Sequence, residues 1–185
     1  MRASASYYKA TAFLLAFFVL VFAIAFSFNR YYPVLVIAGE SSVGTWMSGV
    51  LLTISATISL ILGMRHGWRP WFVFAAFFFV LALDERFMFH EHLKEWIIFS
   101  SHTNQTSRWV YELPAIAGGL VGAYIAIILW KNLEGVSRIF LLSATILGTA
   151  SVTIDVFAAG VLWEECFKLL GELSITCALL RKADL

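Results

Sequence analysis

Charged residues are scarce in this chain, and cysteines are scarcer. Asp, Glu, Lys and Arg make up 14% of its 185 residues, and no run of Lys and Arg predicts a nucleic-acid partner. The two cysteines, Cys166 and Cys177, would lie about 16 Å apart on one helix. A disulfide needs Cα atoms within about 7 Å. The sequence therefore excludes a disulfide framework, and it contains no C-x-x-C metal or redox motif.

Apolar residues dominate instead. They make up 61% of the chain, including seventeen Phe and seven Trp, and the mean hydropathy is +0.83. A soluble domain of this length cannot bury so much apolar surface, because its core grows too slowly with chain length. Aromatic rings also suit lipid contact and the interfacial belts of a bilayer. The composition therefore predicts an all-α polytopic membrane helix bundle.

Six apolar segments each approach the roughly 20 residues that a membrane-spanning helix requires. They cover residues 10–28, 43–64, 70–96, 110–130, 138–159 and 162–180. Only Gly160 signals a turn at the last boundary. One helix over 138–180 would be about 64 Å long, about twice the hydrocarbon thickness of a bilayer, so a hairpin near Gly160 is favoured. We predict one integral membrane domain, residues 1–185, with six transmembrane helices.

The distribution of basic residues predicts the orientation. Eight of them fall at alternate segment ends, and therefore on one side of the membrane: Arg2, Lys9, Arg65, Arg69, Lys131, Arg138, Arg181 and Lys182. Loops rich in Lys and Arg stay in the cytoplasm, so both termini are predicted to be cytoplasmic. We expect the bacterial inner (plasma) membrane as location, with membrane lipid and other membrane subunits as partners.

Titratable residues gather in the opposite, outer half. On a continuous helix over 70–96, Asp84, Glu91 and Glu95 would line one stripe, with Glu85 and His92 on the stripe beside it. Arg86, His90 and Lys94 would lie on the other side. The acidic and basic faces of this helix are therefore predicted to be segregated.

Other segments supply further carboxylates to the same half of the membrane. Glu112 opens the fourth segment, Asp155 lies near the outer end of the fifth, and Glu165 and Glu172 share a face of the sixth. Measured from the cytoplasmic helix ends, the depths of the acids on the third to sixth segments run from about 14 Å for Glu172 to about 31 Å for Glu91. The carboxylates are therefore predicted to lie in one slab, from mid-membrane to the outer interface. An ionised side chain near the bilayer centre costs about 2.5–3.5 kcal/mol, so such groups mark functional sites by default.

Carboxylates with imidazole suit a divalent metal such as Zn, Mn or Fe, and carboxylates also bind protons. The candidate metal ligands are Asp84, Glu85, Glu91, His92, Glu112, Asp155, Glu165 and Glu172. The Glu-x-x-His signature of helix-bundle di-metal sites is absent. His90 is favoured as an interfacial or ion-paired residue, and His92 as the better metal ligand.

Three classes of function fit this cluster. The first is a metal-binding membrane protein, as a metal-dependent enzyme acting on a lipid or small substrate at the outer leaflet. The second is a proton- or cation-coupled transporter, and the third is a non-catalytic accessory subunit of a membrane complex. A purely structural ion-pair network between the acids and Arg86, Lys94 and Lys168 is the competing interpretation.

Overall fold

The computed structural model describes residues 5–28, 42–100, 113–157 and 160–183, and every regular element in these ranges is an α-helix. The helices are α1 (Ala5–Phe28), α3 (Val43–His66), α4 (Arg69–Phe87), α5 (Phe89–Ser100), α7 (Leu113–Asn132), α8 (Val136–Phe157) and α9 (Val161–Ala183). The all-α prediction is confirmed.

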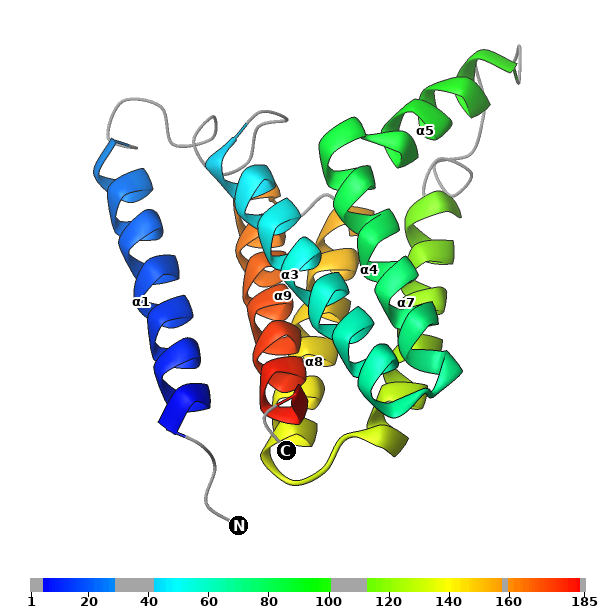
Figure 1. The fold of residues 1–185 in the computed structure, drawn as a ribbon. Helices are drawn as coiled ribbons and strands as arrows, with labels where there is room; N and C mark the ends of the chain where they lie inside the picture. Colours follow the sequence, from blue (N-terminus) through cyan, green and yellow to red (C-terminus); the bar gives the residue numbers. More distant parts are fainter. Residues whose placement is uncertain (1–4, 29–41, 101–112, 158–159, 184–185) are drawn as a thin grey trace.

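Helix α9 lies at the centre of the bundle, packed against α3 on one side and α8 on the other (Figure 1). Helix α4 packs along α3, and α7 packs along α8. Helix α1 stands at one side of the bundle, where Phe18 inserts among Met47 of α3 and Leu169 of α9. The largest apolar core joins α3, α4, α7, α8 and α9 around the fully buried Phe74 and Leu179.

Local signals in the sequence explain where several helices begin and end. The Ser42 hydroxyl caps α3 by accepting a hydrogen bond from the Thr45 backbone N–H, at 3.1 Å. Gly67 ends α3 in the left-handed conformation, with φ of 62°, and its N–H donates to the Gly63 carbonyl. Pro70 then lies in the first turn of α4, where its missing N–H costs nothing.

The hairpin predicted at Gly160 is present. Helix α8 ends at Phe157 and α9 begins at Val161. Gly160 has φ of 136°, a conformation that side-chain-bearing residues rarely adopt. The backbone N–H groups of Trp163 and Glu164 both donate to its carbonyl oxygen, which starts α9.

The segment predicted as one helix over 70–96 is two helices in the structure. Met88 adopts the left-handed conformation, with φ of 51°, and its N–H donates to the Asp84 carbonyl to close α4. The next helix, α5, turns away from the bundle (Figure 1). The stripe predicted through Asp84, Glu91 and Glu95 is therefore wrong, because the helical periodicity is interrupted between the first and second of these residues.

Among the described residues, two helices are long and apolar enough to cross a membrane, namely α3 and the stretch Val136–Asp155 of α8. The apolar stretches Lys9–Val21 of α1 and Ile116–Asn132 of α7 are shorter. The six-span arrangement itself stays a prediction.

The helix ends predicted to share one side of the membrane lie together at one end of the bundle. The start of α1, the α3–α4 turn, the α7–α8 turn and the end of α9 are all at the bottom of Figure 1. The starts of α3 and α9, the end of α4 and all of α5 lie at the other end. The two ends of the bundle therefore differ in charge, with the basic helix ends gathered at the bottom.

Candidate functional site

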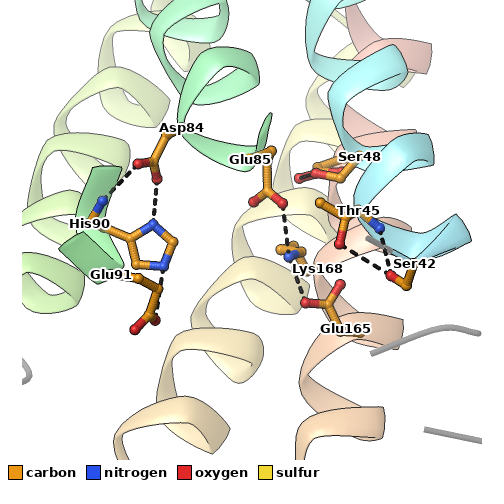
Figure 2. A network of polar contacts seen from close by, with 10 residues as sticks. Ser42, Thr45, Ser48, Asp84, Glu85, His90, Glu91, Glu165 and Lys168 are labelled. Carbon is orange, nitrogen blue, oxygen red and sulfur yellow. Dashed lines mark hydrogen bonds and ion pairs between the residues drawn. The ribbon is translucent and has the colours of Figure 1, made fainter. Parts of the chain in front are cut away.

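Lys168 of α9 binds two carboxylates. Its Nζ atom lies 2.7 Å from Glu165 Oε1, one turn earlier on the same helix, and 3.2 Å from Glu85 Oε2 in the last turn of α4. Figure 2 shows the lysine between the two acids. The side chains of Lys168, Glu85 and Glu165 are 23%, 17% and 12% exposed, so these charges are largely removed from the surroundings of the bundle.

Glu172 lies one helical turn deeper than Lys168. Its Oε1 atom accepts a hydrogen bond from the Ser48 hydroxyl of α3, at 2.7 Å. Its other oxygen, Oε2, is buried without a hydrogen-bond partner among the described residues, and so is Oε2 of Glu165. We call Glu85, Glu165, Lys168 and Glu172 the Lys168 group. It brings two carboxylates onto one ammonium group and places a third, Glu172, one turn away, at the junction of α3, α4 and α9.

Buried hydroxyl groups continue from Glu172 toward the other end of the bundle. Ser48, Ser55 and Ser59 on α3 and Thr176 on α9 are all 0% exposed. Ser55 and Thr176 share a hydrogen bond of 2.9 Å, and Thr176 donates to the Glu172 backbone carbonyl at 2.7 Å. Ser59 Oγ has no partner among the described residues. Sequence reasoning missed this row, although the spacing of Ser48, Ser55 and Ser59 places the three serines on one face of α3.

A second polar group holds the α4–α5 break. Asp84 Oδ1 accepts from the His90 backbone N–H at 2.9 Å, and Asp84 Oδ2 lies 2.7 Å from His90 Nδ1. Asp84 thereby satisfies a free N–H in the first turn of α5. The other ring nitrogen of His90, Nε2, lies 3.2 Å from Glu91 Oε1 (Figure 2). Both ring nitrogens of His90 therefore contact carboxylates, and these contacts are ion pairs when the imidazole is protonated.

The structure divides the eight predicted ligands. Glu85, Glu165 and Glu172 belong to the Lys168 group, whereas Asp84 and Glu91 contact His90. The remaining three candidates belong to neither group. His92 is exposed, and its Nδ1 atom lies within hydrogen-bond distance of the Met88 carbonyl oxygen. Asp155 lies in the last turn of α8, and Glu112 lies outside the described residues.

No three His, Cys, Asp or Glu side chains in the described ranges are placed to hold one metal ion. In the Lys168 group the ammonium of Lys168 lies between Glu85 and Glu165, where a bound cation would have to lie. In the second group, His90 contacts Asp84 and Glu91 through both ring nitrogens. The arrangement can therefore bind a proton without rearranging, whereas a metal would have to displace Lys168 or His90.

The predicted ion-pair network is present in part. Lys168 makes the pairs expected of it, but Arg86 makes no salt bridge within the described part of the chain, and the Lys94 side chain lies outside it. Carboxylates at the Lys168 group outnumber the one lysine that pairs with them.

Comparison with known proteins leaves the fold and its residues as the main guide to function. No curated protein and no solved structure matches the chain. One family model, described as Domain of unknown function (DUF8692), matches residues 8–183, which is nearly the whole length. The chain belongs to this family of proteins with a domain of unknown function.

Proposed function

We propose that the chain is an integral membrane protein of six spans, with both termini in the cytoplasm, in the bacterial inner membrane. The exposure of its large apolar side chains supports this. Phe13 of α1 is 72% exposed, Leu120 of α7 is 68% exposed and Ile139 of α8 is 64% exposed. Only 17% of the apolar stretch of α8 is buried inside the bundle. Such surfaces are stable against lipid and costly against water.

The function we propose for the Lys168 group is reversible proton binding from the outer side of the membrane. One observation carries this proposal: two carboxylates contact one ammonium group in the interior, a third lies one helical turn away, and Oε2 of both Glu165 and Glu172 lacks a hydrogen-bond partner within the described residues. A buried carboxylate without enough partners is costly, and taking up a proton removes its charge and adds a hydrogen-bond donor.

Proton binding would suit a proton-coupled transporter, because intramembrane carboxylates act as relays in such proteins. The buried hydroxyls of Ser55, Ser59 and Thr176 favour this class, since they extend the polar interior inward from Glu172. A Zn, Mn or Fe site used by a membrane enzyme, or an accessory subunit whose polar residues bind partner helices, are the alternatives.

Infrared difference spectroscopy tests proton binding. Protein in lipid bilayers should show the C=O stretching band of a protonated carboxyl group at acidic pH, and this band should disappear on raising the pH. Glu172→Gln should remove the band or reduce it strongly. Glu95→Gln is the matched control, because Glu95 is an exposed residue of α5, and it should leave the buried carboxyl band unchanged. The absence of any pH-dependent carboxyl band in the wild type would refute the proposal.

Elemental analysis of gently extracted protein separates the metal alternative from proton binding. We expect less than stoichiometric Zn, Mn or Fe. A stoichiometric metal that is lost in both Glu165→Gln and Glu172→Gln would replace the proton proposal with the metal site predicted from the sequence.

A further inference from the structure

A groove of about 790 Å³ lies between α3 and the end of α4, and its lining includes none of the carboxylates of the Lys168 group. This volume falls within the range of about 300–1,000 Å³ that is usual for small-molecule sites. The lining of the groove comes from ten residues: Ser42, Val43, Thr45, Trp46, Gly49, Val50, Thr53, Ile54, Ala82 and Arg86. The groove has no role in the proposed proton binding.

The polarity of the lining changes along the groove. Arg86, Ser42 and Thr45 lie at the end where α3 begins and α4 closes. Ala82 lines the groove one turn back along α4, and Ile54, twelve residues along α3 from Ser42, lines its far, apolar end. From Ser42 to Ile54 the groove runs about 18 Å at 1.5 Å per residue. One leaflet of a bilayer provides roughly half of the 30 Å hydrocarbon thickness, so the groove is about one leaflet deep.

The floor of the groove has room for a chain-like ligand. A Cβ atom built on Gly49 would meet nothing within 4 Å, so the missing side chain of this glycine leaves open space. The Thr53 hydroxyl is already hydrogen-bonded there, because it donates to the Gly49 carbonyl at 2.7 Å. An aliphatic chain could lie along α3 without leaving a polar group of Thr53 unsatisfied.

Arg86 supplies a positive charge at the polar end. It is exposed and forms no salt bridge within the described part of the chain. The acids nearest to it in sequence, Asp84, Glu85 and Glu91, contact His90 or Lys168 instead. A guanidinium group binds phosphate oxygens through paired hydrogen bonds. The groove thus combines one phosphate-binding cation with an apolar channel of leaflet depth.

We propose that this groove binds one outer-leaflet phospholipid, with its phosphate on Arg86 and one acyl chain along Gly49, Val50 and Ile54. An anionic headgroup is favoured over a zwitterionic one, because no acidic side chain lines the groove. This proposal rests on the proposed membrane location, but not on proton binding. It adds a lipid site that is separate from the carboxylates.

Native mass spectrometry of the protein released from bilayers of phosphatidylglycerol or phosphatidylcholine tests the site. The wild type should retain one phosphatidylglycerol, and at least tenfold less phosphatidylcholine. Arg86→Gln should lower the retained phosphatidylglycerol about tenfold, and Gly49→Leu should remove it by filling the floor. Two matched controls should behave as the wild type: Lys131→Gln, an exposed cation at the other end of the bundle, and Gly122→Leu, which also has open space around its Cβ.

The possible failures are distinguishable. Equal retention of phosphatidylglycerol by Arg86→Gln, Gly49→Leu and the wild type would overturn the lipid site. The membrane location would still stand if the protein stays in vesicles after an alkaline wash. Loss of the protein from vesicles in that wash would refute both proposals. Inorganic phosphate should not displace the bound lipid. If phosphate displaces it and Gly49→Leu has no effect, Arg86 forms a simple anion site, and the proposed binding of an acyl chain along α3 is overturned.

Discussion

Each carboxylate of the Lys168 group is held in a different way. Glu165 is paired with Lys168 on its own helix, Glu85 reaches the same ammonium from α4, and Glu172 accepts a hydroxyl hydrogen bond from Ser48. Lys168 is the only cation of the group, so two buried charges depend on it directly. Removing one partner of a buried ion pair costs more than the pair itself contributes, because an uncompensated charge is left behind.

Lys168→Met should therefore lower the free energy of unfolding by about 3 kcal/mol, the low end of what loss of a buried partner costs. The measurement is thermal unfolding in detergent. The double variant Lys168→Met with Glu165→Gln should recover part of the loss, because it also removes one unpaired charge. Lys131→Met, an exposed lysine of α7, is the control. An unfolding temperature for Lys168→Met that equals the control's would contradict the description of this group.

The sequence predicts which acids lie within the apolar segments, but not which of them come into contact. The depth of a residue follows from its distance to a helix end, and this predicts that Glu85, Glu165 and Glu172 lie between mid-membrane and the outer interface. Lateral position depends on how helices pack, which depth does not determine. The sequence offered Lys168 only as one of three cations that could pair with the acids, and its position between Glu85 of α4 and Glu165 of α9 is visible only in the structure.

At the scale of helices, the break between α4 and α5 is the main departure from expectation. No Gly or Pro interrupts residues 71–100, so the sequence pattern favours one continuous helix. The structure instead places Met88 in the left-handed region and uses the Asp84 carboxylate to cap α5 through the His90 N–H. Side-chain capping from six residues away cannot be read from periodicity, because the two residues would lie on different faces of an unbroken helix.

Asp84→Ala should loosen α5, because it removes both the cap at the His90 N–H and the contact with the His90 ring. Loss of such a cap costs about 1 kcal/mol. Hydrogen exchange of the α5 backbone amides should accelerate roughly fivefold, while amides of α9 stay unchanged. Asp84→Asn keeps an oxygen that can accept from the backbone N–H. Its exchange rate should therefore fall between those of Asp84→Ala and the wild type. Equal exchange in Asp84→Ala and the wild type would show that α5 does not need this cap.

Helices α8 and α9 approach each other closely at a glycine. A Cβ built on Gly171 would lie 3.4 Å from both the Ala144 carbonyl oxygen and the Gly148 nitrogen of α8. A larger side chain would force these backbones apart. Gly171→Leu should therefore destabilise the bundle by about 1–3 kcal/mol, the usual cost of overpacking. The thermal unfolding temperature should fall for this variant, but not for Gly122→Leu, which has free space around its Cβ. A fall of equal size in both variants would contradict the close approach.

At the scale of the whole molecule, the sequence predicts the helical segments and their alternating direction well. Five of the six predicted apolar segments correspond to single helices, and the basic ends gather at one end of the bundle (Figure 1). Both results follow from local properties, namely apolar length and the position of charges between segments. The crossing of the membrane is a property of the bundle and its surroundings together, so it needs its own experiment.

Labelling of single cysteines from one side of the membrane tests the orientation. In a background of Cys166→Ser and Cys177→Ala, the variant Glu95→Cys should react with a membrane-impermeant maleimide from outside the cell. His66→Cys, at the end of α3 that is predicted to face the cytoplasm, should react only after the membrane is opened. Reaction of both variants from the outside would refute the six-span arrangement with cytoplasmic termini.

The central claim is that Glu172 is a buried carboxyl group that takes up a proton inside the bundle, and one measurement addresses it directly. An apolar carbodiimide reacts with protonated carboxyl groups in apolar surroundings, and mass spectrometry of the digested protein locates the adduct. We expect the adduct on Glu172 in vesicles, with a yield that falls as the pH rises, and its loss in Glu172→Gln. An adduct confined to exposed acids such as Glu95, or a yield on Glu172 that does not change with pH, would contradict the account.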